Sequence, residues 1–226
     1  MSVDQIKEIS VIGSGAMGSQ IAMVAALSGF DVKLQDINEE SLGKAEKELR
    51  FRLNKRAEKG KVSKKEVEEA FSRLTFLSSL EDAVNNSDFV IEAIIENVEV
   101  KKELFEKLDK LAPPHAILST NSSTIVSSKV AHHTNRPEKV CNFHFFNPAL
   151  VMEMVEVVQG PHTSEETSQT AFELAKKLNK TPILLKKEIS GFVANRILGK
   201  VMNEAFICMK MKSRQQKRST LPVQRH

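Results

Sequence analysis

The sequence predicts an α/β protein built on a doubly wound, mainly parallel sheet. Short, continuously apolar runs recur along the chain, which is typical of strands that are buried on both faces. Longer charged segments with apolar residues at helical spacing lie between these runs. Strands that alternate with helices in this way pair in parallel and are covered by helices on both faces.

Each element follows from its own pattern of apolar residues. The predicted strands are Ile9–Ile12, Asp31–Gln35, Leu74–Leu77, Phe89–Ala93, Ile117–Ser119, Val140–Phe145, Met154–Val158 and Ile183–Leu185. The predicted helices are Ala16–Ser28, Glu39–Glu58, Lys64–Ser72, Val98–Leu111 and Ser164–Leu178, followed by a new helix within Gly191–Met209. Two consecutive helices without a strand between them predict a helical-pair insertion at residues 39–72.

The positive net charge belongs to the end of the chain. The formal charge is +4, but residues 210–226 hold six Lys or Arg and no acidic residue, so the remainder carries 27 basic against 29 acidic residues. The predicted fold therefore gives no reason to expect a nucleic-acid partner. The tail has no apolar periodicity and is expected to be unstructured.

The cysteines and the hydropathy of the chain indicate what kind of protein this is and where it works. Cys141 and Cys208 are the two cysteines, and neither lies in a Cys-x-x-Cys pair or a Cys/His cluster, so no metal site is expected. Few cysteines favour a reducing compartment. No apolar stretch approaches the ~20 residues that span a bilayer. We therefore expect a cytoplasmic protein with no membrane partner.

A glycine-rich motif lies between the first predicted strand and the first predicted helix. Gly13-Ser14-Gly15-Ala16-Met17-Gly18 matches Gly-x-Gly-x-x-Gly, and the flanking strand and helix are the context that the motif requires. Gly13 would allow the tight turn, Gly15 would let a pyrophosphate approach the backbone, and Gly18 would let helix and strand pack closely. The motif predicts a Rossmann-type dinucleotide site, with the phosphates at the helix N-terminus.

Asp36 closes the second predicted strand and favours NAD as the cofactor. A carboxylate at this place accepts hydrogen bonds from the adenosine ribose hydroxyls and repels the 2′-phosphate of NADP. No Arg follows Asp36 to offset that repulsion. The alternative is that the glycines form an ordinary tight turn and that Asp36 caps the next helix.

Polar residues lie at or after the ends of several predicted strands, where an open α/β sheet binds its ligands. They are Glu96-Asn97, Asn121-Ser122-Ser123, the run His144-Phe145-Phe146-Asn147-Pro148, and Glu156. A histidine titrates near neutral pH, so His144 is a candidate base for removing the hydroxyl proton of an alcohol as NAD takes a hydride. Glu156 on the next strand could hold its tautomer. On spacing alone, a histidine before two Phe is more often a residue of the core than a catalytic one.

Three stretches resemble the L-3-hydroxyacyl-CoA dehydrogenase family. They are the loop Gly13 to Gly18, the run His144-Phe145-Phe146-Asn147-Pro148, and Gly191-Phe192-Val193-Ala194-Asn195-Arg196. The resemblance covers roughly Ile6 to Met209 and is specific, since related sugar-acid dehydrogenases usually lack the two adjacent Phe. A short single-function chain of this kind is most similar to bacterial 3-hydroxybutyryl-CoA dehydrogenases, which implies a C4 substrate.

The resemblance also implies roles for individual residues. His144 would be the general acid/base, with Glu156 as its partner, and Ser123 and Asn195 would bond the 3-oxygen of the acyl-CoA substrate. Glu96, Lys101, Asn147 and Ser123 would line the nicotinamide-ribose side of the cofactor, opposite the site formed by Gly13, Gly15, Ala16, Met17, Gly18 and Asp36. Arg52, Lys55, Arg56 and Lys59 match the place where the family holds the CoA nucleotide, although a solvated helix face explains them equally well.

The chain departs from the family after Met209. Family members usually continue past Asn195-Arg196 with several helices that complete the substrate cleft and form a homodimer interface. We therefore expect three parts: an NAD-binding catalytic domain at 1–188, the first helix of a truncated all-α C-terminal domain at 189–209, and the basic tail at 210–226. The alternatives to a working dehydrogenase are an NAD-binding module with little turnover and, with less support, a nucleic-acid binder that uses the tail.

Overall fold

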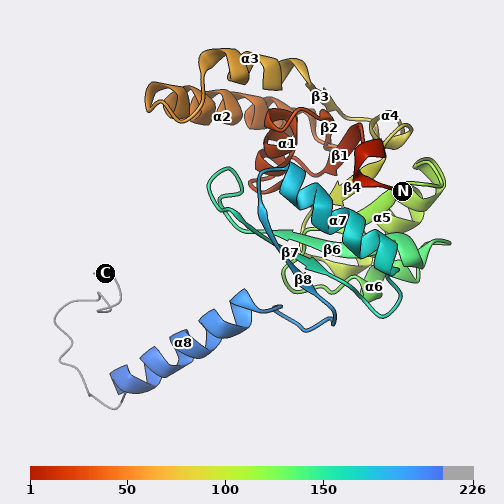
Figure 1. The fold of residues 1–226 in the computed structure, drawn as a ribbon, viewed down its shortest axis with the longest axis vertical. Helices are drawn as coiled ribbons and strands as arrows, with labels where there is room; N and C mark the ends of the chain where they lie inside the picture. Colours follow the sequence, from red (N-terminus) through yellow and green to blue (C-terminus); the bar gives the residue numbers. More distant parts are fainter. Residues whose placement is uncertain (211–226) are drawn as a thin grey trace. The chain divides into compact units, whose positions relative to one another are not determined.

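The computed structural model describes residues 1–210, and these divide into two compact units. The first unit is Met1–Ser190, and the second begins at Gly191 (Figure 1). The first unit carries the sheet and most of the predicted site residues. The second is described by itself at the end of this subsection.

The first unit is organised around one eight-stranded sheet with the order β3-β2-β1-β4-β5-β6-β7-β8. Every neighbouring pair is parallel except β6 and β7, which are antiparallel. The predicted doubly wound, mainly parallel sheet is therefore confirmed. The strands are β1 (Glu8–Ile12), β2 (Asp31–Gln35), β3 (Leu74–Leu77), β4 (Phe89–Glu92), β5 (Ile117–Thr120), β6 (Val140–Phe145), β7 (Met154–Val158) and β8 (Thr181–Leu185).

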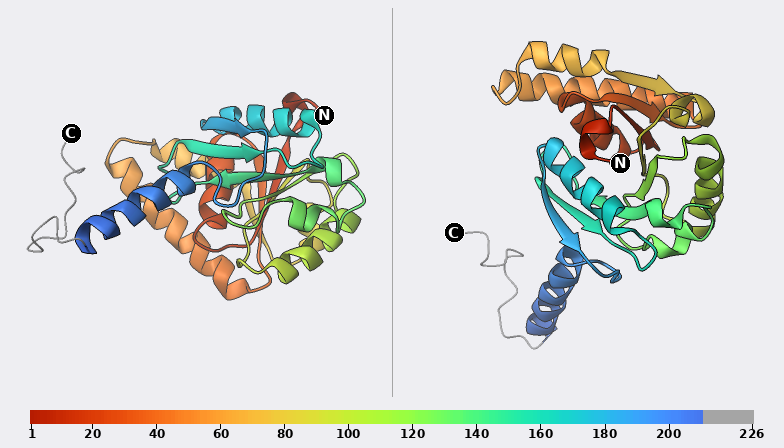
Figure 2. Two further views of the ribbon diagram at one scale, coloured as in Figure 1. Left: turned by 90° about the horizontal axis from the view of Figure 1, so that it is seen from below. Right: turned by 45° about the vertical axis from the view of Figure 1, so that its right-hand side comes forward.

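Two hydrophobic clusters, which alternate along the strands, cover the two faces of the sheet. In β1, Val11 belongs to the cluster that includes α1, α2, α3 and α7, and Ile12 belongs to the cluster that includes α4, α5 and α6. This alternation is the two-residue period of a strand that is buried on both sides. Figure 2 shows helices on either side of the sheet. The helices are α1 (Gly18–Leu27), α2 (Glu39–Glu58), α3 (Lys64–Ser72), α4 (Leu80–Val84), α5 (Val98–Leu111), α6 (Ser128–Ala131) and α7 (Glu165–Lys177), with short 3₁₀ turns at Val3–Gln5 and Pro137–Lys139.

The helical-pair insertion forms as the sequence predicts. Helices α2 and α3 lie side by side (Figure 1). Asn38 caps the N-terminus of α2 by accepting a hydrogen bond from the Ser41 amide, and Ser63 and Glu66 form a capping box at the start of α3. The caps explain why these two charged helices begin where they do.

A few elements differ from the predicted ones at their ends. Helix α1 begins at Gly18, two residues after the predicted start, because the glycine loop extends to the N-cap residue Met17. Strand β8 begins at Thr181 and includes Pro182, which an edge strand tolerates because one side of its backbone has no partner. Helices α4 and α6 were not predicted, because segments of five and four residues are too short to show helical periodicity.

The second unit contains helix α8 (Ala194–Lys210). The helix that the sequence predicts after Gly191 is therefore present, and Lys210 is its last residue. None of the residues of α8 is buried. The rest of the predicted basic tail, 211–226, lies outside the described residues. No helix in the described part of the chain is long and apolar enough to cross a membrane.

Candidate active site

The glycine loop lies where the order of the strands reverses. The chain runs from β1 outward to β2 and β3 and then returns to β4 on the other side of β1, so β1 and β4 flank the switch point. Gly13 follows β1 with a φ of +103°, and a Cβ at this residue would lie 2.6 Å from the Ala93 carbonyl oxygen just after β4. A Cβ at Gly18 would overlap the Gly13 carbonyl. The loop can therefore adopt this path only with glycine at these two positions.

Asp36 contacts the glycine loop directly. Its Oδ2 accepts hydrogen bonds from the Ser14 amide at 2.9 Å and the Ser14 hydroxyl at 2.8 Å, and its Oδ1 accepts one from the Asn38 amide at 3.0 Å. The N-cap of α2 is Asn38, so Asp36 is not the helix cap that the alternative interpretation required. The carboxylate is held at the carboxyl end of β2, beside the loop.

The residues present fit a bound dinucleotide. A Cβ at Gly15 would meet no atom within 4 Å, so open space lies directly over the loop where a pyrophosphate would approach. The N-terminus of α1 begins three residues later, and its free amides and positive dipole end favour phosphate. Ala16 is exposed and Met17 half-buried beside that space. NAD would be held here by the loop, with Asp36 at the adenosine ribose.

His144 and Glu156 form a buried pair on β6 and β7, which are separated from β1 by β4 and β5 in the sheet. They face each other across the antiparallel strands β6 and β7, and the His144 Nδ1 lies 3.0 Å from the Glu156 Oε2. His144 is 5% exposed and Glu156 is fully buried. Two residues that are directly opposite in an antiparallel pair have neighbouring Cβ atoms, so the strand register alone brings the imidazole and the carboxylate together.

The protonation state of His144 follows from this burial. Burial lowers the pKa of His144 below its ordinary value of 6.5, while the hydrogen bond and charge of Glu156, and the charge of Glu96, act in the opposite direction. Burial prevails, so the imidazole is neutral at neutral pH. With the Glu156 side chain accepting the Nδ1 proton, the lone pair of the neutral ring is on Nε2. The pair can therefore act as a general base.

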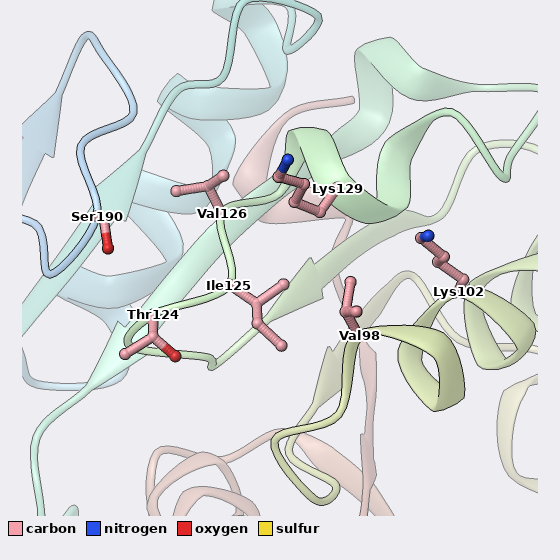
Figure 3. Close-up of a pocket in the computed structure, with 7 residues that line it drawn as sticks. All are labelled: Val98, Lys102, Thr124, Ile125, Val126, Lys129 and Ser190. Atoms are coloured by element: carbon pink, nitrogen blue, oxygen red, sulfur yellow. The ribbon is translucent and has the colours of Figure 1, made fainter.

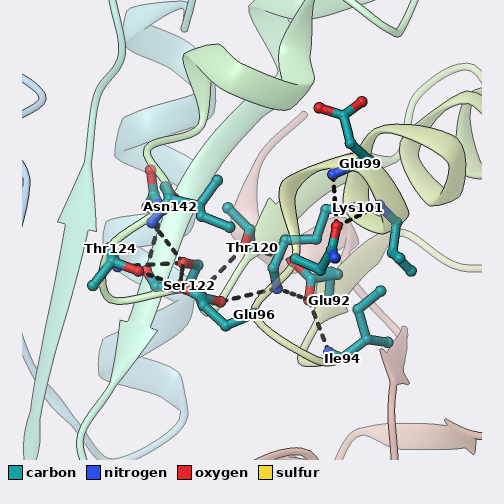
Figure 4. Close-up of polar contacts among 12 residues, drawn as sticks. Glu92, Ile94, Glu96, Glu99, Lys101, Thr120, Ser122, Thr124 and Asn142 are labelled. Carbon is teal, nitrogen blue, oxygen red and sulfur yellow. Dashed lines mark hydrogen bonds and ion pairs between the residues drawn. The ribbon is translucent and has the colours of Figure 1, made fainter.

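The loop after β5 brings Ser122 and Thr124, the neighbours of the predicted residue Ser123, into one polar cluster with Glu96. The Glu96 carboxylate accepts hydrogen bonds from the hydroxyls of Ser122 and Thr124 (Figure 4). Burial acts to raise the pKa of Glu96, but these hydrogen bonds and the charge of Lys101 outweigh it and lower that pKa. Glu96 is therefore ionised near neutral pH. Ser123 is half-buried in the same loop.

Lys101 is buried beside the same cluster. Its side chain is 1% exposed, and its ammonium group pairs with the fully buried Glu92 and, at 3.4 Å, with Glu96. The second oxygen of Glu92 accepts a hydrogen bond from the Thr120 hydroxyl at 2.6 Å, and the Ile94 amide donates to the first at 2.8 Å (Figure 4). Glu92 was not among the residues that the sequence pattern predicts for the site. The available signal was a single acidic residue at the end of the apolar strand Phe89–Glu92.

Three asparagines near the site have different roles. Asn97 caps α5 by accepting hydrogen bonds from the amides of Glu99 and Val100, so it has a structural role. The Asn121 side chain accepts a hydrogen bond from the Phe145 amide at 2.9 Å and so joins the loop after β5 to the end of β6. Asn142 is fully buried on β6 and bonds the backbone of the same loop. Asn142 was likewise not predicted from the sequence pattern.

Other predicted residues are not brought to the His144 pair within the first unit. Asn147 is exposed in the loop after β6, and its peptide bond to Pro148 is cis. Asn195 belongs to the second unit. The basic residues of α2 are on its exposed or half-buried faces: Arg52 pairs with Glu48 at 2.7 Å, Lys55 lies 4.2 Å from the centre of the Phe51 ring, Arg56 is half-buried and Lys59 is exposed. Both interpretations of these four residues stay open.

A surface pocket of about 440 Å³ lies beside the segment Thr124 to Val126 (Figure 3). Val98, Ile125 and Val126 form its apolar wall, and Lys102 and Lys129 add two ammonium groups. None of the predicted site residues lines it. Across residues 1–210, no group of three or more His, Cys, Asp or Glu side chains is arranged to hold a metal ion.

Comparison with known proteins assigns this arrangement to a family. The family described as "3-hydroxyacyl-CoA dehydrogenase, NAD binding domain" matches residues 8–189. The chain belongs to this family. The match covers the sheet, the glycine loop and the His144–Glu156 pair, and it confirms the family and the cofactor that the sequence predicts.

Individual relatives agree with the family match. The chain is 43% identical over 205 residues to a probable 3-hydroxybutyryl-CoA dehydrogenase of Bacillus subtilis. The aligned residues cover 91% of this chain and 71% of the relative. It is 40% identical over 198 residues to the 3-hydroxybutyryl-CoA dehydrogenase of Clostridioides difficile, covering 88% and 70%. The human mitochondrial hydroxyacyl-coenzyme A dehydrogenase is 38% identical, and the chain spans 65% of its length.

Solved structures show the same fold. The (S)-3-hydroxybutyryl-CoA dehydrogenase of Ralstonia eutropha superimposes with a TM-score of 0.90 at 32% identity, covering 94% of this chain and 75% of that one. A 3-hydroxybutyryl-CoA dehydrogenase of Escherichia coli gives a TM-score of 0.88 at 38% identity, covering 92% and 43%.

Proposed function

We propose that this chain interconverts an L-3-hydroxyacyl-CoA and the 3-ketoacyl-CoA with NAD, and that its substrate is 3-hydroxybutyryl-CoA. The observation that carries the proposal is the buried His144–Glu156 pair near the carboxyl end of β6. The glycine loop follows the carboxyl end of β1, so the pair and the loop lie at the same end of the parallel strands. An alcohol dehydrogenation needs a base and a dinucleotide site close together. The family match supports the reaction class, and the names of the bacterial relatives support the C4 substrate.

The pair supplies the proton chemistry of this reaction. Glu156 holds the Nδ1 proton of His144, so Nε2 accepts the proton of the substrate hydroxyl during oxidation. In the reverse direction the imidazolium returns that proton to the 3-oxygen. The nearby carboxylate stabilises the imidazolium and so lowers the cost of charging a buried ring. NAD, when it is bound on the glycine loop, supplies the hydride acceptor, and its reduced form supplies the donor.

Further residues would hold the substrate and the cofactor. Ser123 and Asn195 are proposed to bond the 3-oxygen. Lys101 and Glu96 are proposed to line the cofactor beside the catalytic pair, and their mutual distance of 3.4 Å supports a joint role. Asn147, in the loop that follows β6, is proposed to contact the same part of the cofactor. Arg52, Lys55 and Lys59 on α2 are proposed to hold the CoA nucleotide.

A direct assay tests the proposal. NADH binding is measured by fluorescence titration, and the reduction of acetoacetyl-CoA is followed by the loss of NADH absorbance. Turnover that depends on His144 and falls with longer acyl chains supports the proposal. Binding of NADH without turnover of any acyl-CoA contradicts it and identifies the chain as an NAD-binding module.

A homodimer in the cytoplasm completes the proposal. The chain has two cysteines, Cys141 and Cys208, and so low a number supports a reducing compartment. Light scattering coupled to gel filtration measures the mass of the particle, and a monomer across the micromolar range contradicts the dimer.

A further inference from the structure

Asn142 lies on the same strand as His144, two residues earlier. Side chains two apart on a strand point to the same face, so the amide of Asn142 and the imidazole of His144 are neighbours on one face of β6. Asn142 is fully buried. A fully buried polar side chain must find hydrogen-bond partners, since an unpaired one is costly. The partners that Asn142 finds all belong to the loop that carries Ser123.

The loop 122–127 folds around this one amide. The Asn142 Oδ1 accepts a hydrogen bond from the Ser127 amide at 2.7 Å. Its Nδ2 donates to the Ile125 carbonyl at 3.1 Å and, more weakly, to the Ser122 carbonyl at 3.4 Å (Figure 4). Asn142 therefore bonds the loop at its beginning, middle and end. We call these three contacts the Asn142 bracket.

Ser123 lies inside the bracketed segment, directly after Ser122. Ser123 is half-buried, and the path of the backbone sets the place of its Cβ, from which rotation about one bond places the hydroxyl. Ser122 also bonds Glu96 and the Ile125 amide, and Glu188 accepts hydrogen bonds from the Ser127 hydroxyl and the Ser128 amide. Just before the loop, Asn121 accepts a hydrogen bond from the Phe145 amide of β6. Within 122–127, the hydrogen bonds to β6, the strand that carries His144, are those of the bracket.

We propose that Asn142 is a positioning residue that fixes the Ser123 hydroxyl relative to His144, so that both can reach the same substrate oxygen. This inference rests on the proposed function for the role of Ser123. Asn142 acts through the loop and touches neither the substrate nor the cofactor. The amide suits this task because it presents an acceptor to one backbone amide and a donor to two backbone carbonyls at once.

Substitutions at Asn142 separate the bracket from simple packing. Asn142→Ala removes all three hydrogen bonds. Asn142→Asp keeps the volume and the acceptor for the Ser127 amide, but it places an oxygen against the carbonyls of Ile125 and Ser122. A packing role predicts nearly normal behaviour for Asn142→Asp, and the bracket predicts a defect. Ser10→Ala is a matched control, because it removes buried hydrogen bonds to Ala83 and Ser87 far from the loop.

The measurement is the binding of acetoacetyl-CoA to the chain loaded with NAD⁺. Substrate and cofactor are then both oxidised, so binding is read without turnover. We expect Asn142→Ala, Asn142→Asp and Ser123→Ala each to weaken this binding by about 3- to 10-fold, the loss that one ordinary hydrogen bond gives. NADH affinity should stay within about 2-fold, and Ser10→Ala should match the wild type.

The double variant decides whether Asn142 acts through Ser123. If it does, Asn142→Ala in the Ser123→Ala background should add little further loss. Losses that multiply in the double variant would overturn the proposal, as would a normal Asn142→Asp or an equal loss in Ser10→Ala.

Hydrogen exchange of the wild-type chain tests the bracket without any variant or substrate. The Ser127 amide should exchange as slowly as the amides of β6, and faster exchange at the rate of an open loop would overturn the proposal. If the wild-type chain binds no acetoacetyl-CoA, the proposed function fails, and the Ser127 amide still decides whether the bracket exists.

Discussion

The imidazole of His144 and the carboxylate of Glu156 meet because β7 runs antiparallel to β6. The two residues are directly opposite in the strand register, and their Nδ1 and Oε2 atoms are 3.0 Å apart. β7 is antiparallel to its neighbour, whereas every other pair in the sheet is parallel. A parallel β7 would have required a crossover connection of a dozen or more residues. Here the connection from Phe145 to Met154 is short, and it returns Glu156 to the level of His144.

Removing either member of the pair should impair turnover more than cofactor binding. His144→Gln should lower kcat by roughly 10²–10⁴, the usual share of general acid/base catalysis, with NADH affinity nearly unchanged. Glu156→Gln should lower it less. Because the two residues act as a unit, the double variant should be little worse than His144→Gln. Steady-state kinetics of acetoacetyl-CoA reduction gives these values, and multiplicative losses would contradict a coupled pair.

The pH profile should report on the same contact. The hydrogen bond and charge of Glu156 raise the pKa of His144, against the larger lowering by burial. Glu156→Gln removes the raising contribution, so the pKa of His144 should fall further. During oxidation of 3-hydroxybutyryl-CoA the base is lost when His144 is protonated, so the acidic limb of kcat/KM should move to lower pH. A limb that stays in place or moves to higher pH would contradict this assignment.

Cofactor preference should depend on Asp36. Asp36→Ser removes the carboxylate that repels a 2′-phosphate, so it should weaken NADH binding and strengthen NADPH binding. Ser14→Ala, which removes one of the two hydrogen bonds from Ser14 to Asp36, should weaken NADH binding by about 3-fold. Fluorescence titration with both nucleotides measures the ratio. Asp31→Ser, at the start of the same strand, is the control and should leave the ratio unchanged.

The sequence predicted the parts of the fold and the site that local pattern determines. The glycine loop was recognisable because Gly13 and Gly18 have a fixed spacing and a strand before them. The ends of most strands followed from apolar runs. The family and its cofactor followed from the resemblance of three short stretches, and the comparisons confirm both.

Contacts that depend on packing could not be read from the sequence in the same way. Glu92 and Lys101 are nine residues apart and pair inside the protein only because β4 and α5 place them there. Asn142 is one polar residue in an apolar strand, and its partners in the loop 122–127 become evident only when β5 and β6 are paired. The antiparallel direction of β7 was likewise hidden, because apolar runs look the same in either direction.

Arg136 should stabilise the end of α5. Its guanidinium pairs with the Asp109 carboxylate at 2.8 Å and donates to the carbonyls of Asp109, Ala112 and Pro113 where the helix ends. Both side chains are largely buried. Arg136→Ala should therefore lower the free energy of unfolding by roughly 2–3 kcal/mol. Lys44→Ala breaks an exposed pair with Glu40 and should change it by less than about 0.5 kcal/mol.

The difference in the free energy of unfolding between the wild type and Arg136→Ala should become smaller in acid. Burial acts to raise the pKa of Asp109, but hydrogen bonds from Asn135 and Arg136 and the charge of Arg136 lower it below its ordinary 3.8. A carboxyl whose pKa is lowered in the folded state stabilises the protein above its unfolded pKa, and that contribution is lost as pH falls through the folded pKa. Urea unfolding at pH 7 and below pH 4 tests this, and a difference that grows in acid would contradict it.

The buried pair of Glu92 and Lys101 should show strong coupling. Both side chains are at most 1% exposed, and each is the main partner of the other. Removing one charge leaves the other without compensation inside the protein, which usually costs about 3–5 kcal/mol. Glu92→Gln and Lys101→Met should therefore each destabilise the fold strongly. The double variant buries neither charge, so it should be more stable than the sum of the two single losses implies. Urea unfolding of the four proteins gives the coupling energy, and simple additivity would mean that the two charges do not depend on each other.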